Sequence, residues 1–208
     1  MLASNRQYLQ VIIECLIFNA QQNIAVRVRE ESRKDIWEVS DINRGNFLEL
    51  LHLRCKDFPW LKSKLQSQLQ SHAQWTSPAI QNELLDIVSN MILQKITAEV
   101  RRSGFFGIIV DETSDISKTG RQVSMCLRYV IDGETKETFT GFYKTNSTEG
   151  EVLYELVKAA VSKLELCLGN IIAECFDGAA NMSGTHKGLA TRMKECSPLA
   201  STWHSKTP

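Results

Sequence analysis

The stretch GFFGIIVDETSD, residues 104–115, decides how the second half of the chain is interpreted. Its apolar run from Phe105 to Val110 has the length of one strand and is followed at once by the carboxylate of Asp111. A continuous apolar run predicts a strand that is covered on both faces of a sheet. An acid at the end of such a strand either begins a turn or holds a ligand such as a metal ion.

Strand patterns continue after this stretch. Residues 121–131 alternate between apolar and polar side chains, which predicts a half-exposed strand, and Asp132-Gly133 offers a tight hairpin turn into a strand over about 136–145. That next strand carries Phe139, Phe142 and Tyr143.

A helix and a fourth strand complete this pattern. Thr148 and Glu151 have the spacing of a capping box and predict the start of a helix with an apolar stripe from Val152 to Leu164. Residues 171–176 then form a short apolar strand that ends on Asp177. A loop of small residues follows and leads into a last helix holding Leu189 and Met193.

The order strand-strand-strand-helix-strand-helix predicts an α/β (α+β) fold with a partial, mixed sheet. A helical crossover places the strand over 171–177 parallel to the strand over 105–111. Ligand sites in open α/β sheets gather where parallel strands end. The sequence therefore predicts that Asp111 and Asp177 lie side by side.

The first part of the chain, residues 1–103, has helical periodicity, and residues 104–208 form the sheet region. Apolar residues recur at helical spacing over residues 4–19, whereas residues 20–43 are polar and form a connection. Asn46 is predicted to cap one helix, Pro59 to lie in the first turn of a second, and Ser77-Pro78 to begin a third. The apolar face predicted for this third helix is Ile80, Leu84, Ile87, Val88, Met91, Ile92 and Ile96.

The composition excludes several classes of protein. The 24 basic and 24 acidic residues balance, which argues against a chain that binds nucleic acid through overall charge. No apolar run is long enough for a membrane span, so no membrane partner is expected. The six cysteines show no C-x-x-C pair, and we interpret them as reduced thiols. A zinc site is disfavoured because no common finger has the spacing of its candidates, Cys175, His186, Cys196 and His204.

Two neighbouring carboxylates repel each other, and a divalent cation relieves that repulsion. Mg²⁺ and Mn²⁺ prefer such hard oxygen ligands, and a pair of these ions can cleave a phosphodiester. A third acid usually completes the site, but the local candidates are poor. Glu112 and Glu174 are expected on the other face of the sheet, and Asp115 lies beyond its strand. For each aspartate, a turn residue remains the alternative.

The chain resembles the hAT-superfamily transposases of the domesticated type found in zinc finger MYM-type and related proteins. The matching stretches are NRGNFLELL (43–51), TSPAIQNELLDIV (76–88), FFGIIVDETSDIS (105–117), CLRYV (126–130) and FDGAANMSGTHKGL (176–189). The resemblance implies an RNase H-like core. It also implies that Asp111 and Asp177 are the first two members of an Asp-Asp-Glu triad that binds magnesium.

Two departures from that family weaken the case for activity. The family glutamate lies far downstream, and the family's His-Cys-x-x-His stretch breaks off here after His204. We therefore expect a truncated core without transposase activity, in which Asp111 and Asp177 are a vestigial pair with weak affinity for Mg²⁺. We also expect marginal stability, with an edge of the sheet unpaired because the fifth strand of the family lies downstream.

Two other functions remain open. The N-terminal helices could dock a protein partner or a second copy and act in transcription, as the resemblance implies. Alternatively, another chain or missing residues could complete a magnesium-dependent nuclease. The candidate residues for DNA binding are Arg27, Arg29, Arg33, Lys34, Arg101 and Arg102. We expect such binding to be weak, because Glu30, Glu31 and Asp35 interrupt the first cluster, from Arg27 to Lys34. Of the nucleus and the cytoplasm, the resemblance favours the nucleus.

Overall fold

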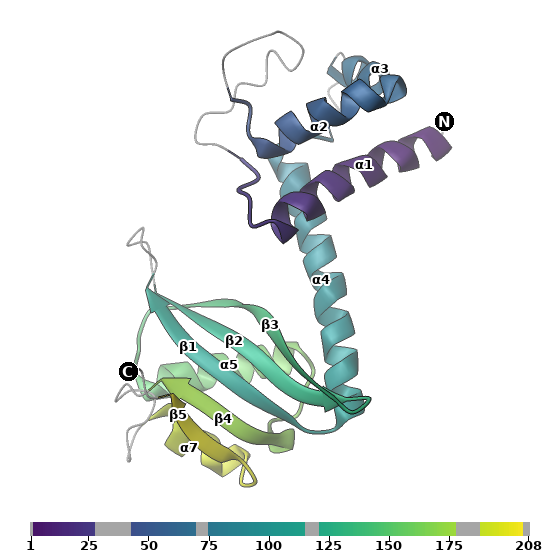
Figure 1. Cartoon of the computed structure of the whole chain (residues 1–208). Coiled ribbons are helices and arrows are strands. Elements are labelled where there is room, and N and C mark those ends of the chain that lie inside the picture. Colours follow the sequence, from purple (N-terminus) through teal and green to yellow (C-terminus); the bar gives the residue numbers. More distant parts are fainter. Residues whose placement is uncertain (1, 28–42, 70–74, 115–120, 178–187, 206–208) are drawn as a thin grey trace. The chain divides into compact units, whose positions relative to one another are not determined.

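A computed structural model describes residues 2–27, 43–69, 75–114, 121–177 and 188–205. The chain divides into two compact units, Met1–Asn90 and Met91–Pro208, and each is described by itself. Figure 1 shows a helical first unit and a second unit built on a sheet. The predicted segment 178–181, Asp115 and most of the connection over 20–43 lie outside the described residues.

The first unit consists of α1 (Leu2–Gln21), α2 (Asn46–Asp57), α3 (Pro59–Leu69) and the first turns of α4 (Pro78–Ser103). The predicted helix starts at Pro59 and Pro78 are confirmed. The predicted cap at Asn46 is wrong, because Gly45, with φ of 93°, occupies the cap position. Asn46 is the first helical residue and donates instead to the carbonyl oxygen of Ala25 at 2.6 Å. The core side chains include Tyr8, Ile12, Leu16, Phe47, Leu51, Leu61 and Leu65.

Helix α4 contributes to both cores, and its predicted apolar face is only partly buried. Ser77 caps it as expected, since its hydroxyl oxygen accepts the N–H of Ile80 at 3.3 Å. The start of the helix packs on the first core, and its last turns pack on the second. The prediction of one continuous buried face is wrong in the middle, where Ile87, Met91 and Ile92 are exposed.

The second unit contains a sheet of five strands: β1 (Phe106–Ser114), β2 (Arg121–Ile131), β3 (Glu134–Thr145), β4 (Ile171–Asp177) and β5 (Ser201–Ser205). Their spatial order is β3-β2-β1-β4-β5 (Figure 1). β1, β2 and β3 pair antiparallel, whereas β4 is parallel to both β1 and β5. The predicted mixed sheet is therefore confirmed.

Strand β5 was not predicted. The fifth strand was expected downstream of the chain, but Ser201–Ser205 forms one and pairs with Ala173–Asp177. β4 is consequently an inner strand of the sheet. A run of only five residues with one central tryptophan is too short to give a clear alternation, which explains why it was missed.

The turns and helix starts that connect the strands agree only in part with the predictions from the sequence. Asp132 and Gly133 both have positive φ, 54° and 82°, as the predicted two-residue hairpin turn requires. The predicted capping box is wrong, because α5 (Gly150–Lys163) has Glu149 at its cap position and no side-chain capping bond there. A short 3₁₀ helix, η1 (Leu168–Asn170), precedes β4, and α7 (Leu189–Cys196) precedes β5.

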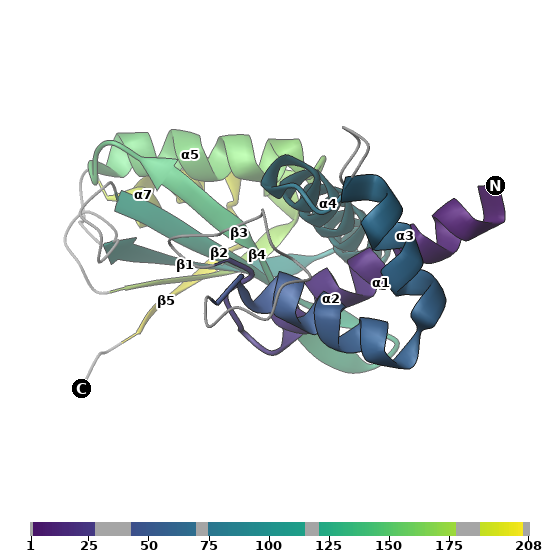
Figure 2. The ribbon, with the colours of Figure 1, turned by 90° about the horizontal axis from the view of Figure 1, so that it is seen from above.

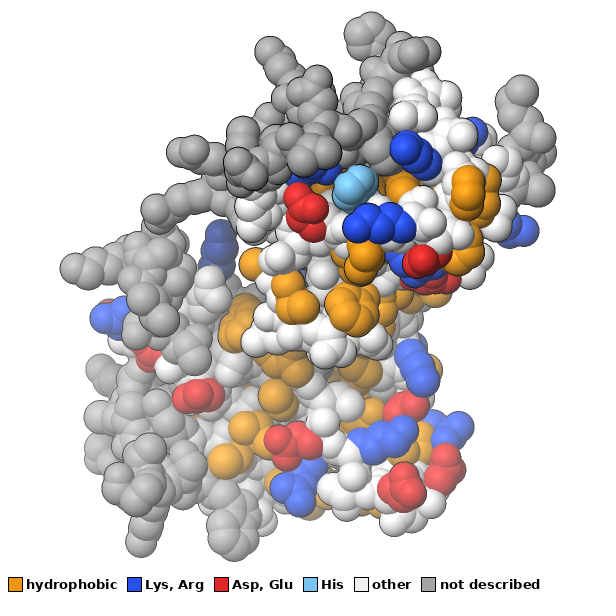
Figure 3. Space-filling view, turned by 45° about the horizontal axis from the view of Figure 1, so that its top comes forward, with side chains coloured by type: hydrophobic (Ala, Val, Ile, Leu, Met, Phe, Trp, Pro, Cys, Tyr) orange, Lys and Arg blue, Asp and Glu red, His pale blue; other side chains and the backbone are white. Residues whose placement is uncertain are grey.

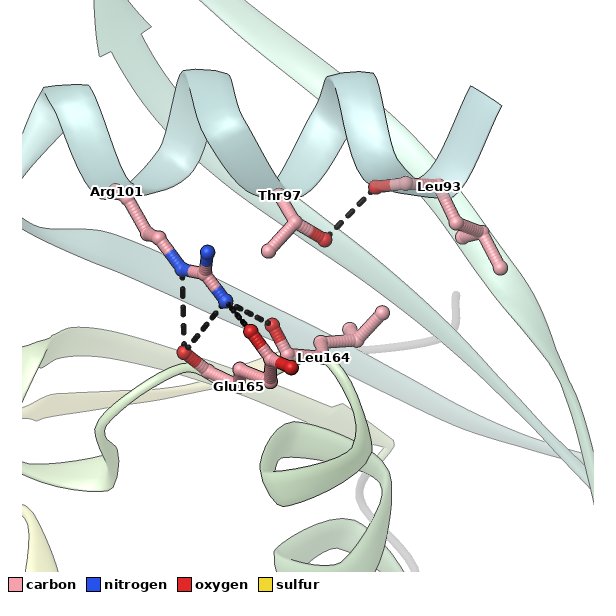
Figure 4. A network of polar contacts seen from close by, with 5 residues as sticks. All are labelled: Leu93, Thr97, Arg101, Leu164 and Glu165. Carbon is pink, nitrogen blue, oxygen red and sulfur yellow. Dashed lines mark hydrogen bonds and ion pairs between the residues drawn. The ribbon is translucent and has the colours of Figure 1, made fainter. Parts of the chain in front are cut away.

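Helices cover one face of the sheet. Figures 1 and 2 show α5 and α7 on the same side, and Val100 near the end of α4 belongs to the same core. The predicted inward residues of β2, from Val123 to Ile131, are all buried against these helices. Arg101 of α4 binds the end of α5, as Figure 4 shows.

The other face of the sheet is much more open. In the described part of the second unit it carries no helix, and Val130, Phe139 and Phe142 are exposed. The prediction that β1 is covered on both faces is therefore wrong. Its apolar run is explained by alternation, in which Phe106, Ile108 and Val110 are buried while Ile109 is only half-buried on the open face.

Candidate metal-binding edge of the sheet

The strands that carry the two predicted aspartates are neighbours. β1 and β4 pair in parallel register from Gly107 with Ala173 to Val110 with Phe176. Asp111 and Asp177 are the next residues of the two strands. The backbone therefore brings the two positions to the same edge of the sheet, as the crossover argument predicted.

The carboxylate of Asp111 is exposed. The alternation of β1 directs it to the open face, opposite the buried side chain of Val110. Its backbone pairs with Ser124 of β2, whose hydroxyl donates to the carbonyl oxygen of Asp111 at 3.4 Å. The side chain of Asp177 lies outside the described residues, and its backbone pairs with Ser205. The two-carboxylate site accordingly stays a prediction.

The acids that were considered poor third ligands lie as follows. Glu112 contacts Arg121, with Oε1 and Nη1 3.7 Å apart, and its backbone pairs with the buried Val123. Glu174 is paired with Ile108 and is fully buried on the helix-covered face. Alternation therefore separates both from Asp111, as expected. In the described ranges, no three His, Cys, Asp or Glu side chains gather in a way that could hold a metal ion.

Glu174 is an unusual residue because a carboxyl group is costly to bury. Burial raises its pKa from 4.5 to about 7, while a contact with Thr202 opposes that shift. The Thr202 hydroxyl donates to Oε2 at 3.4 Å, and Oε1 has no hydrogen-bond partner among the described residues. Near neutral pH this acid is therefore partly protonated inside the core.

The disfavoured zinc site involves residues that the structure describes only in part. His186 and the side chain of His204 lie outside the description. The Cys196 sulfur lies 2.9 Å from the Tyr154 hydroxyl, and this hydrogen bond is the main cause that raises the pKa of Tyr154 to about 12. All six cysteines are free thiols, as expected.

The basic residues considered for DNA binding are engaged with protein groups where they are described. Arg101 and Arg102 form ion pairs with Glu165 and Asp132. Arg27 donates to the carbonyl oxygen of Pro78 at 3.3 Å. Arg29, Arg33 and Lys34 lie outside the described residues.

A cleft of about 520 Å³ lies on the second unit, away from Asp111. Its wall includes Phe105, Gly107, Val130 and Ile172, which places it at the beginning of β1 and β4 rather than at their ends. The parallel edge with the two aspartates is therefore a different region of the surface. None of the described helices is both long enough and apolar enough to cross a membrane.

A mixed sheet with three antiparallel strands, a helical crossover and two further parallel strands defines an RNase H-like class of fold. The chain belongs to the ZMYM1/FAM200 RNase-like domain family (DUF4371), whose model matches residues 1–188. The resemblance to transposase-derived proteins of the zinc finger MYM type is thereby confirmed.

Curated relatives are similar over nearly the whole chain. The "52 kDa repressor of the inhibitor of the protein kinase" from Mus musculus is 25% identical over 207 residues, which cover 94% of this chain and 26% of the relative. The Homo sapiens protein of the same name is 26% identical over 94% of this chain and 25% of its own length. The chain thus spans about a quarter of the length of these relatives.

Proposed function

We propose that this chain is a transposase-derived RNase H-like domain of the hAT type that binds a divalent cation weakly through Asp111 and Asp177. The supporting observation is the parallel register of β1 and β4, in which each strand continues from a buried residue, Val110 or Phe176, into an aspartate. Hard oxygen ligands on adjacent strands suit Mg²⁺ or Mn²⁺. The ion would supply charge to polarise a phosphate oxygen or a bound water.

We propose further that the 208-residue chain alone does not cleave or join DNA. The family resemblance matches two acids of a three-acid site within this sequence. Two carboxylates leave an ion with less charge compensation and a less defined position. Loss of charge compensation or of a defined ion position lowers the rate of metal-dependent phosphoryl transfer by orders of magnitude.

Metal binding can be tested with Mn²⁺, which is a spectroscopic substitute for Mg²⁺. We expect Asp111→Asn and Asp177→Asn each to weaken Mn²⁺ binding by about tenfold or more, measured by electron paramagnetic resonance of the free ion. Asp132→Asn is the matched control, because Asp132 is also exposed and lies in the β2–β3 turn. Equal Mn²⁺ affinity in all four proteins would refute the site.

The absence of cleavage needs a separate assay. Supercoiled plasmid is incubated with the chain and Mg²⁺, and nicked product is measured on a gel. We expect no more product than with Asp111→Asn. Robust nicking that Asp111→Asn abolishes would instead show a competent nuclease, completed by an acid from a second chain.

A second candidate function is protein binding by the helical unit. Apolar side chains of this unit face solvent, with Phe18 of α1 47% exposed and Leu53 of α2 54% exposed. The relatives are named as repressors, and a repressor acts through partners; by that likeness we propose the nucleus as the site of action. Light scattering after size-exclusion chromatography tests the homodimer form, and a monomer at high concentration would exclude it.

A further inference from the structure

Strand β3 contains a bulge that changes which side chains reach the open face. Met125 of β2 pairs with Gly141 and the next residue, Cys126, pairs with Phe139, so that Thr140 is an extra residue. The Thr140 hydroxyl is buried and donates to the carbonyl oxygen of Met125 at 2.8 Å. The extra residue and its anchor fix the register on either side of the bulge.

The bulge brings two phenylalanines to one face. Phe139 and Phe142 are three positions apart and would alternate to opposite faces in a regular strand. Here their partners are Cys126 and Ser124, two positions apart on β2, and therefore both rings lie on the same side. The ring centroids are 4.9 Å apart and the rings meet edge to face at 61°.

Both rings are open to solvent. Phe139 is 49% exposed and Phe142 is 61% exposed, and neither belongs to the hydrophobic core of the second unit. β3 is also one of the two outer strands of the sheet. Figure 3 shows hydrophobic side chains interspersed with charged ones on the surface of the sheet turned toward the viewer.

The surroundings of this aromatic pair are mixed: the row of Phe139 continues through Cys126 to Ile109, whereas a cation lies on the side of Phe142. Lys144, which pairs with Gln122 in the next row of the same face, is exposed. Phe142, Ser124 and Asp111 form a single row across β3, β2 and β1. Phe142 and Asp111 are separated in that row by two strand spacings of about 4.8 Å each, which is a backbone distance of about 10 Å.

We propose that Phe139 and Phe142 form a stacking platform for unpaired bases of a single-stranded nucleic acid, with Lys144 facing its phosphates. Exposed aromatic rings on an open sheet surface stack bases with little sequence preference. The row to Asp111 directs a bound strand toward the proposed metal-binding edge, and in this respect the inference rests on the proposed function. Lys144, an exposed cation two residues from Phe142 on the same face, favours a strand with phosphates over an apolar protein segment.

The test measures binding of the 208-residue chain to a fluorescent 12-nucleotide oligothymidine by anisotropy, with EDTA present to exclude metal effects. A second oligonucleotide of equal length carries abasic sites and therefore has the same phosphates without bases. We expect the base-containing strand to bind at least tenfold more tightly. Because a single lysine supplies the phosphate contact, we expect a shallow dependence on salt.

Variants locate the platform. Phe139→Ala with Phe142→Ala is expected to reduce affinity for oligothymidine at least tenfold and to remove the preference over the abasic strand. Phe142→Trp is expected to keep both the affinity for oligothymidine and the preference over the abasic strand. Phe105→Ala is the matched control, because Phe105 is 52% exposed and lies outside the pair. Circular dichroism checks that each variant is folded, as expected for exposed positions.

Other results would overturn the proposal. Equal binding of the two oligonucleotides, or unchanged binding by the double variant, excludes base stacking. A dimer that the double variant dissociates, measured by light scattering, assigns the rings to a second copy. Asp111→Asn in EDTA should bind oligothymidine as well as the parent chain. The proposed metal site and the proposed stacking platform are therefore tested separately, and either one can be refuted without the other.

Discussion

Glu174 links the pH of the solution to the stability of the second unit. Its carboxyl is fully buried and its pKa is raised from 4.5 to about 7, chiefly by burial. The folded protein therefore holds a proton between these two values that the unfolded chain releases. The free energy of unfolding must fall as pH rises from 4.5 to 7, by roughly 3 kcal/mol at most, and then level off.

Glu174→Gln removes this titration while it keeps the shape of the side chain. We expect the difference in unfolding free energy between variant and parent to grow in favour of the variant from pH 4.5 to pH 7. Urea unfolding at a series of pH values measures it. A difference that does not change with pH would show that Glu174 titrates normally. Thr202→Val, which removes the opposing hydrogen bond, should raise the pKa of Glu174 further.

Gly107 allows β1 and β4 to approach closely. A Cβ atom at this position would lie 3.2 Å from the Ala173 Cβ and 3.3 Å from the Ala173 carbonyl oxygen, so that Ala173 would have to move by a few tenths of an ångström. We expect Gly107→Ala to lower the free energy of unfolding by about 1–2 kcal/mol, despite the usual cost of glycine in a strand.

The double variant Gly107→Ala with Ala173→Gly separates crowding from backbone effects. It removes the closer of the two contacts, and it should be less unstable than the sum of the two single variants, as measured by urea unfolding. Additive losses would mean that the side chain of Ala173 does not cause the crowding.

At the scale of elements, α4 and α5 are joined by a cap made from a side chain. Arg101 of α4 donates from Nε and Nη2 to the carbonyl oxygen of Glu165, at 3.3 and 3.2 Å, and from Nη2 to that of Leu164 at 3.5 Å (Figure 4). These carbonyls follow the last turn of α5, where backbone acceptors lack helical partners. A cation there also interacts favourably with the helix dipole.

Arg101→Ala is expected to lower the free energy of unfolding by about 1 kcal/mol. Glu165→Gln keeps the carbonyl bonds and removes only the exposed ion pair, so its effect should stay below about 0.5 kcal/mol. Thermal unfolding followed by circular dichroism compares the two. If Glu165→Gln costs as much as Arg101→Ala, the ion pair rather than the cap stabilises this joint.

The sequence predicted elements well where hydrophobic periodicity was strong. The alternation of β2, the Asp132-Gly133 turn and the helix start at Pro78 were confirmed because each depends on local chemistry. The cap at Asn46 was wrong because the Asn46 side chain makes a tertiary hydrogen bond to Ala25 instead. The cap at Thr148 was wrong by one residue, since Glu149 occupies that position. The bulge at Thr140 has one signal in the sequence, the isolated glycine Gly141 inside a strand, but the pattern of alternation was not interpreted with it, and the common orientation of the two phenylalanines was therefore missed.

For the whole molecule, the chain order of strands and helices was enough to predict the mixed sheet, since crossover handedness leaves few topologies. The neighbouring positions of Asp111 and Asp177 followed from the same rule. The exposure of Ile87, Met91 and Ile92 could not be predicted from the sequence, because a periodic apolar stripe carries no information about where one core stops and another begins. That division requires knowledge of tertiary packing.

The two hydrophobic cores share no residue in the described part of the chain. We therefore expect each core to unfold with its own free energy, independent of the other. Leu61 is fully buried in the first core and Leu127 in the second, and α4 is the helix that contributes to both. We expect Leu61→Ala to lower the protection of amides in α1 and α2 against hydrogen exchange, by an amount equivalent to about 2–4 kcal/mol, while amides of β1 and β2 keep their protection.

Leu127→Ala should give the converse pattern, with protection lost in the sheet and kept in α1 and α2. Native-state hydrogen exchange followed by mass spectrometry measures both regions in one sample. Val130→Ala is the control, because Val130 is the exposed neighbour of a buried residue on the same strand. If either buried substitution lowered protection equally in both regions, α4 would transmit stability between the cores, and the chain would unfold as one cooperative unit.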